Sequence, residues 1–328
     1  MFALIACGRP AQVHTLSGMT MGTTWTVKLA ALPAALTLAD LRSEIEGLLE
    51  SVNAQMSTYR EDSLISRFNR ADTGESFLVP EAFASVLQTA LALAAETDGA
   101  YDPTVGPLVN LWGFGPGDER TAAPAAGAIA RMRDRVGWQR LHFDAGERLL
   151  IQPGGVYLDL SSIAKGHAVD RIADHLLARG IASLLVDIGG DMRLHGRRPD
   201  GRLWRMAIER PLAGVREVYK IIEPGDRAIA SSGSYRNFFR DQDTEYSHTI
   251  DPRSGYPVAH DLVAVTVIDA RCTLADALAT ALHVLGPEEG YAFAVERDLL
   301  AMFLTRDGNT VNERLTPALA RLLAQTPQ

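Results

Sequence analysis

The chain has 328 residues, of which 47% are hydrophobic and 22% charged, a composition typical of a globular protein with a large core. Its net charge of -8 argues against general nucleic-acid binding, because such binding needs a basic surface. Its two cysteines, Cys7 and Cys272, exclude a disulfide framework and a structural zinc site built from cysteines.

The N-terminal segment is apolar and ends in Leu4-Ile-Ala-Cys7, which resembles a bacterial lipobox. The apolar run is short and no positive charge precedes it, so it is not a complete signal peptide. Either the true start lies upstream, which we favour, or the match is chance. We predict that residues 1–18 are the remnant of a lipoprotein signal and a tether, and that residues 19–328 form a single domain.

The first half of the chain alternates strand-like and helical patterns. Gly18–Ala30 ends in a strand-like alternation, and the capping box Thr37-x-x-Asp40 precedes a long amphipathic helix. Further predicted elements are a helix over 64–69, a helix over 80–98, and a hairpin of 141–143 with 149–152. The segment 100–115 combines prolines, glycines and aromatic residues, which predicts an ordered loop or short helix over a pocket.

The second half continues in the same mixed way. Val156–Leu160 is predicted to be a buried strand that leads into a helix over 164–177. The other predicted elements are strands over 184–188, 192–195, 204–209, 218–222, 228–233, 262–268 and 300–304, and a helix over 317–324. Thr273-Leu-Ala-Asp276 is predicted to cap a further helix that runs to Gly286. This intermixing predicts an α+β fold, with mixed sheets and helices packed on them.

The junction after Val156–Leu160 concentrates polar groups. Ser161 and Ser162 are suitable N-cap residues, and Asp159 and Lys165 flank them. The end of a strand and the start of a helix leave backbone groups unpaired, which suits a polar ligand. The alternative is an ordinary capped helix with a solvated lysine.

Three further residues could take part in chemistry. Asp276 and Thr280 lie four positions apart on one predicted helix, and their oxygens are the hard ligands that magnesium prefers. Asp276 could equally be an acid that complements the helix dipole. His248 lies among turn residues and could act as a general base, although a histidine in a loop is often structural.

Together these stretches resemble the FAD:protein FMN transferases, also called ApbE-type flavin transferases, from about Met21 to about Gly286. The similarity rests on motifs that follow one another in the expected order: Met21-Gly-Thr, Ser57-Thr-Tyr59, Asp102-Pro-Thr-Val-Gly-Pro, Asp159-Leu-Ser-Ser-Ile-Ala-Lys165-Gly, Asp187-Ile-Gly-Gly-Asp191, His248-Thr-Ile-Asp251-Pro and Ala275-Asp276-Ala-x-Ala-Thr280.

The resemblance implies an enzyme that cleaves FAD with Mg²⁺ and moves FMN onto a threonine or serine of a partner protein, releasing AMP. It implies that the FAD site is lined by Met21, Tyr59, Ala100, Tyr101, Asp102, Asp159, Lys165 and Ile250. It implies that Ser162, Asp276 and Thr280 surround the metal, with Ser162 contributing its carbonyl. His248 would activate the acceptor hydroxyl, and His248, Asp276 and Lys165 would be the catalytic residues.

The family also suggests where the protein acts. Its members are commonly exported or lipid-anchored, which agrees with the segment ending at Cys7. We therefore expect a lipid anchor at Cys7 on the periplasmic face of the bacterial inner membrane, and an acceptor that is a membrane-associated redox protein. Ala279 falls where some relatives carry an aspartate, which leaves the number of carboxylates at the metal open.

Two other functions fit the same motifs. A metal-dependent FAD pyrophosphatase would use water in place of the protein hydroxyl, at the same site. The second alternative is a protein that binds or carries flavin without catalysing a reaction. The presence of Lys165, His248 and Asp276 argues against it.

Overall fold

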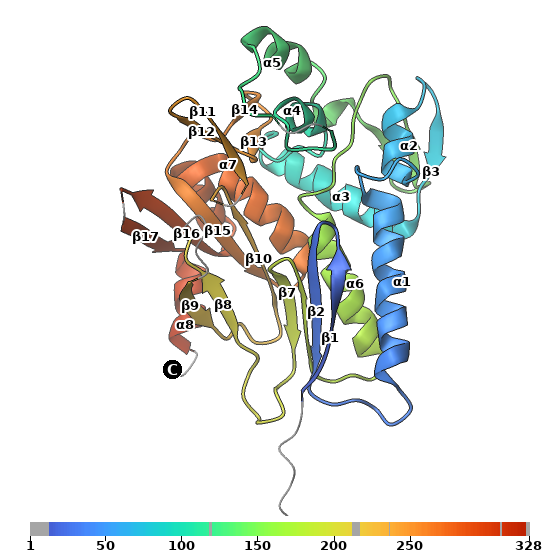
Figure 1. Ribbon diagram of the computed structural model, residues 1–328, viewed down its shortest axis with the longest axis vertical. Helices are drawn as coiled ribbons and strands as arrows, with labels where there is room; N and C mark the ends of the chain where they lie inside the picture. Colours follow the sequence, from blue (N-terminus) through green and yellow to red (C-terminus); the bar gives the residue numbers. More distant parts are fainter. Residues whose placement is uncertain (1–12, 118–119, 212–216, 236, 309, 326–328) are drawn as a thin grey trace, which may run out of the picture.

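The computed structural model describes residues 13–117, 120–211, 217–235, 237–308 and 310–325. Its centre is an eight-stranded sheet in the order β1-β2-β6-β7-β10-β15-β16-β17, in which each described pair is antiparallel (Figure 1). Its strands are β1 (His14–Thr20), β2 (Thr23–Leu29), β6 (Leu184–Ile188), β7 (Asp191–His195), β10 (Ala228–Gly233), β15 (Leu262–Asp269), β16 (Leu300–Asp307) and β17 (Thr310–Leu315).

Smaller sheets and the helices surround this centre. The short strands are β3 (Ser76–Leu78), β4 (His142–Asp144), β5 (Leu149–Ile151), β8 (Met206–Glu209), β9 (Val218–Ile222), β11 (Phe238–Asp241), β12 (Thr244–Ser247), β13 (Ile250–Asp251) and β14 (Tyr256–Pro257). The helices are α1 (Leu38–Met56), α2 (Leu64–Arg70), α3 (Glu81–Glu96), α4 (Gly106–Leu111), α5 (Ala126–Arg133), α6 (Ala164–Ala178), α7 (Cys272–Glu296) and α8 (Pro317–Gln325). No helix in these described ranges combines the length and the apolar character that a membrane span requires.

The central sheet is covered on both faces, because its strands alternate between two apolar clusters. Val186 and Val265 belong to the larger cluster, which α1, α3, α6 and α7 complete. Leu185 and Ile268 belong to a smaller cluster with the β8–β9 hairpin and α8. Helices α6 and α7 therefore lie together on one face of the sheet, where the residues of the predicted site begin.

Most predicted elements are confirmed, and the fold is α+β with helices packed on the sheets. Thr37 caps α1 through a hydrogen bond from Asp40 N to its hydroxyl at 3.1 Å. The segment over the pocket contains α4, and its Trp112 indole donates to the Gly255 carbonyl at 2.9 Å. This contact joins the segment to the turn-rich region after His248.

Four predictions of local structure are wrong. Val156–Leu160 is buried but forms no strand, because Asn69 bonds the backbone of Leu158 in place of a neighbouring strand. The N-cap of α6 is Ile163, which makes no side-chain cap, so Ser161 and Ser162 do not have that role. α7 likewise has no cap from its own chain neighbourhood, since its N-cap is Arg271.

The fourth wrong prediction concerns the tether. Part of the segment up to residue 18 belongs to β1, which begins at His14 and pairs with β2 along its whole length. Cys7 and the lipobox-like residues lie outside the described residues. No sequence pattern indicated the β11–β12 hairpin. The helix predicted to end at Gly286 kinks there, where φ is 84°, and α7 continues to Glu296.

Candidate active site

A large cleft, with a volume of about 1090 Å³, lies at the ends of the central strands. It is lined by the β1–β2 turn, the end of α1, the α4 segment, the start of α6, the β6–β7 turn, β10 and α7. All the predicted site residues contribute to its wall: Met21, Tyr59, Ala100, Tyr101, Asp102, Asp159, Ser162, Lys165, His248, Ile250, Asp276 and Thr280. The volume is at the upper end of the range for small-molecule sites.

Lys165, in the first turn of α6, lies between two carboxylates. Its Nζ donates to Asp191 Oδ2 at 2.5 Å and to Asp276 Oδ1 at 3.3 Å. Burial alone would lower the pKa of Lys165, but the two carboxylates together raise it, so the amine stays charged. Burial, and then repulsion from Asp191, raise the pKa of Asp276 above its usual range. Asp191 was not predicted as a site residue, although the motif Asp187-Ile-Gly-Gly-Asp191 contained it.

Asp276 also caps α6. Its Oδ2 accepts a hydrogen bond from Gly166 N at 2.9 Å, one of the first N–H groups of α6, which have no partner within the helix. The Ser162 carbonyl lies just before the N-cap Ile163. Among the described residues no backbone N–H donates to that carbonyl. Only glycine fits at position 166, because an added Cβ would overlap the Cys272 carbonyl oxygen and lie 2.8 Å from Asp276 Cβ. The two helices therefore meet in direct contact, and a free carbonyl faces the cleft.

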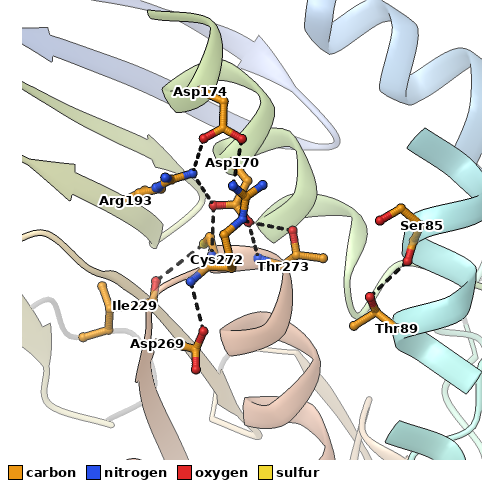
Figure 2. Close-up of polar contacts among 10 residues, drawn as sticks. Ser85, Thr89, Asp170, Asp174, Arg193, Ile229, Asp269, Cys272 and Thr273 are labelled. Atoms are coloured by element: carbon orange, nitrogen blue, oxygen red, sulfur yellow. Dashed lines mark hydrogen bonds and ion pairs between the residues drawn. The ribbon is translucent and has the colours of Figure 1, made fainter. Parts of the chain in front are cut away.

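The N-terminus of α7 is capped in return by a residue of α6. Asp170 accepts hydrogen bonds from Cys272 N at 3.1 Å and from Thr273 N at 2.9 Å (Figure 2). Its carboxylate also pairs with Arg193 at 3.0 Å and with Arg271 at 3.2 Å, and it is fully buried. This network fixes the first turn of α7, which carries Asp276 on its next turn.

His248 approaches the cleft from the other side. Its Nδ1 lies 3.1 Å from the carbonyl oxygen of Asn237, so Nδ1 carries the hydrogen and Nε2 is left as the basic nitrogen. Burial lowers the pKa of His248, so the ring is neutral at pH 7. Within the described part of the chain no hydrogen bond occupies Nε2. The geometry is that of a general base.

The two tyrosines of the cleft differ in what they offer a ligand. Tyr59 is 67% exposed, and its hydroxyl lies 3.4 Å from the Phe114 carbonyl. Tyr101 is buried, and its hydroxyl accepts a hydrogen bond from Ser162 Oγ at 3.0 Å. A flat aromatic ligand can therefore stack on the ring of Tyr59. The ring of Tyr101 is too buried for such stacking.

The predicted acids Asp102 and Asp159 hold the walls of the cleft. Asp102 accepts from Thr104 N at 2.7 Å and from Trp138 N at 3.0 Å, so its carboxylate shapes the segment before α4. Asp159 accepts from Ser161 N at 2.9 Å and shapes the turn into α6. Both carboxylates are largely buried, so their roles in ligand binding stay predictions.

A cation fits the bottom of this cleft. Within the described ranges no three His, Cys, Asp and Glu side chains gather as a metal cluster, so any cation there would depend on few carboxylates and on neutral oxygens. The Asp276 carboxylate, the Thr280 side chain one turn later and the Ser162 carbonyl provide such oxygens. Ala279 is buried away from the cleft wall, so it takes no part in this set.

The fold and the cleft define an enzyme that handles a large phosphorylated ligand with an ammonium group, carboxylates and a histidine base. The chain belongs to the ApbE family, whose model matches residues 21–304. A relative named FAD:protein FMN transferase, from Vibrio cholerae, is 43% identical over 98% of this chain and 96% of its own length. A relative of the same name from Escherichia coli K12 is 35% identical over 96% and 92%.

Solved structures agree with this assignment. The flavin transferase ApbE from Vibrio cholerae superposes with a TM-score of 0.88 at 43% identity, and the match covers 95% of this chain and 99% of that one. The apo form of the Pseudomonas stutzeri flavinyl transferase ApbE gives a TM-score of 0.86 at 40% identity, with 96% and 98% covered.

Proposed function

We propose that this protein transfers FMN from FAD to a threonine or serine hydroxyl of a partner protein, with Mg²⁺, and releases AMP. The observation that carries the proposal is the meeting of Lys165, Asp276 and His248 in one cleft, in a chain whose relatives are named for this reaction. The same three residues are separated by up to 111 positions in the sequence.

The reaction is a displacement at phosphorus. The acceptor oxygen forms a bond to the FMN phosphorus, and the bond from that phosphorus to the oxygen bridging to AMP breaks. The hydroxyl proton passes to Nε2 of His248, and AMP leaves with the bridging oxygen. Lys165 lies where it would stabilise negative charge on the phosphates, and Tyr59 offers a face for the isoalloxazine.

A magnesium ion would be held by Asp276, Thr280 and the Ser162 carbonyl, with water and phosphate oxygens as further ligands. When bound, it would neutralise charge on the pyrophosphate and help AMP to leave. The acidic chain makes such a cation more important, because its own net charge of -8 repels a dianionic ligand.

We also propose that the mature protein is lipid-anchored through Cys7 at the periplasmic face of the inner membrane and acts on a membrane-associated redox protein. The support is the lipobox-like Leu4-Ile-Ala-Cys7. Cells that express the gene from its native start should yield the protein in the membrane fraction, with a lipid-modified Cys7 in its mass spectrum. A soluble cytoplasmic protein with unmodified Cys7 would contradict this.

The activity is tested by incubating the protein with FAD, Mg²⁺ and a purified acceptor domain, and weighing the products. We expect the acceptor to gain the mass of an FMN phosphoester while AMP appears in equal amount, and a chelator to stop both. Free FMN with AMP, and an unmodified acceptor, would show a pyrophosphatase. Bound FAD without turnover would show a flavin-binding protein.

A further inference from the structure

Strand β10 has two neighbours of unequal length, which leaves part of one edge open. It pairs with β15 at six positions, from Ala228 to Gly233, but with β7 only at Ala228 and Ile229. The remaining residues extend past the start of β7, which begins at Asp191. Ser231, Ser232 and Gly233 all line the cleft. Because successive side chains of a strand face opposite ways, three consecutive lining residues mean that the strand presents its edge.

The direction of the backbone groups along this edge follows from two hydrogen bonds. The Arg227 carbonyl accepts from Leu194 N at 2.9 Å, so the carbonyl of residue 227 points toward β7. Ser234 N donates to the Val263 carbonyl at 3.1 Å, so residue 234 points toward β15. Strand geometry alternates with a period of two, so the N–H and C=O groups of Ser231 and Gly233 point away from β15, into the cleft.

These groups have no backbone partner among the described residues. The edge therefore offers two donors and two acceptors, alternating at the spacing of a β-ladder. Ser231, which carries one donor and one acceptor of this edge, is exposed. An unpaired edge of this kind is a template for another extended chain.

We propose that the acceptor protein binds here, with the segment around its modified threonine or serine added to β10 as an extended strand. The proposal rests on the transferase function proposed above. A second polypeptide complements all four groups, because its own N–H and C=O groups alternate in the same way. The phosphates of FAD can only accept hydrogen bonds, so they would leave the two carbonyls of this edge unpaired.

The edge also lies beside the base that the reaction needs. Ser232 Oγ lies 3.4 Å from His283 Nδ1, and Thr249 Oγ1 lies 3.3 Å from the same nitrogen. Thr249 follows His248, and Asn237, which orients the His248 ring, comes four residues after Gly233. A hydroxyl on a strand paired near Gly233 is thereby brought toward His248.

Recognition through backbone groups sets the class of acceptor. The acceptor segment should be extended, exposed and free of proline at the positions that donate to the edge. Small residues next to the hydroxyl would let the segment enter the cleft.

The main test uses synthetic peptides that copy the sequence around the modified residue of an acceptor domain in which FMN transfer has been observed by mass. Each peptide carries one N-methylated backbone amide, which removes a donor and keeps the side chains. We expect kcat/KM for the peptide to fall at least tenfold at alternate positions and to change little at the positions between. A uniform effect, or none, would overturn the proposal.

The matching protein variant is Ser231→Pro, which removes an N–H that β15 does not use, a place where strands tolerate proline. We expect a higher KM for the acceptor with unchanged FAD affinity, measured by quenching of flavin fluorescence. Val311→Pro is the control, because the N–H of Val311 also points outward, on the distant edge strand β17. It should leave the KM for the acceptor at the parent value.

Each result separates the two proposals. If the parent protein modifies no acceptor at all, the transferase function itself fails. If transfer occurs and Ser231→Pro leaves the KM for the acceptor unchanged, only the docking edge is refuted. If Ser231→Pro weakens FAD binding to the same degree, the edge binds the flavin and not the acceptor, which also refutes the proposal.

Discussion

The N-termini of α6 and α7 are closed by the same exchange, in which each helix gives a carboxylate to the other. Asp170, which is fully buried, caps α7 and pairs with two arginines in a network that also includes the partly exposed Asp174 (Figure 2). Asp276 caps α6, but among the described residues only Lys165 forms an ion pair with it, and Lys165 is shared with Asp191.

The difference between these two caps is one of charge. Two carboxylates and two arginines balance each other at the Asp170 end, whereas two carboxylates and one ammonium leave a net negative charge at the Asp276 end. The charges at the Asp170 end are therefore balanced, and this end has a structural role. The Asp276 end lies on the cleft wall, and its excess negative charge would attract a cation. Four changes test this comparison.

The largest effect is expected from Asp276→Ala. Transfer under saturating FAD and Mg²⁺ should slow by about 10³-fold, because charge on the phosphates loses its main counter-ion. The free energy of unfolding should fall by only about 1 kcal/mol, the usual cost of losing a helix cap. Single-turnover kinetics and urea unfolding measure the two quantities. Transfer at a near-normal rate would remove Asp276 from the site.

Asp170→Ala should have the opposite profile. It leaves Arg193 and the first N–H groups of α7 without their buried carboxylate, so it should cost about 3–5 kcal/mol of stability. The surviving folded protein should still transfer FMN, at a rate reduced by much less than in Asp276→Ala. A parent-like stability in urea, together with abolished transfer, would show that Asp170 serves the reaction and not the fold.

His167, which lies near Asp170, makes the stability of the protein depend on pH. Burial, and then repulsion from Arg171, lower the pKa of His167 to about 4, and its Nε2 has no hydrogen-bond partner among the described residues. Stability from the neutral ring is complete above pH 6.5 and is lost as the pH falls toward 4. At pH 5 the loss from this residue should be about 2 kcal/mol. His167→Gln should flatten the decline in urea-unfolding free energy between pH 7 and pH 5.

The flattening should be partial, because His283 has a pKa lowered to about 3 by burial and adds a decline of the same sign. A decline of the same size in His167→Gln as in the parent would show that His167 makes no contribution.

The smallest effect is expected from Ser162→Ala. The predicted metal contact is the backbone carbonyl of this residue, and its hydroxyl only donates to Tyr101. The substitution should therefore change the transfer rate by less than about threefold and stability by about 1 kcal/mol. The Mg²⁺ concentration for half-maximal rate is the relevant measurement, and it should stay at the parent value. A large increase would mean that the hydroxyl itself holds the cation.

The sequence predicted which residues meet in the cleft better than it predicted how they are held. Asp276, Thr280 and Lys165 follow from motif order, and all three line the cleft. The cap of α7 could not be read from Thr273-x-x-Asp276, because the capping carboxylate, Asp170, lies 102 positions away from Cys272. Local patterns describe contacts between near neighbours, whereas this contact depends on how two helices pack.

Two other failures have related causes. Val156–Leu160 has the composition of a buried strand, yet its backbone bonds to an asparagine side chain and not to a ladder. Asp191 was noted only as the end of the motif Asp187-Ile-Gly-Gly-Asp191, and the contact with Lys165 of α6 gives it a place in the site. In each case the deciding partner is distant in the sequence.

The exchange of caps also has a consequence for how the protein is made. Gly166 and Asp276 are 110 positions apart, and α7 is synthesised near the end of the chain. A growing chain that already contains Lys165 and Tyr59 therefore lacks both the carboxylate of the site and the helix that carries it. Contacts this distant form late in folding, because the long loop between them must first be closed. The cleft acquires its chemistry only when translation is nearly complete, so unfinished chains should not consume FAD.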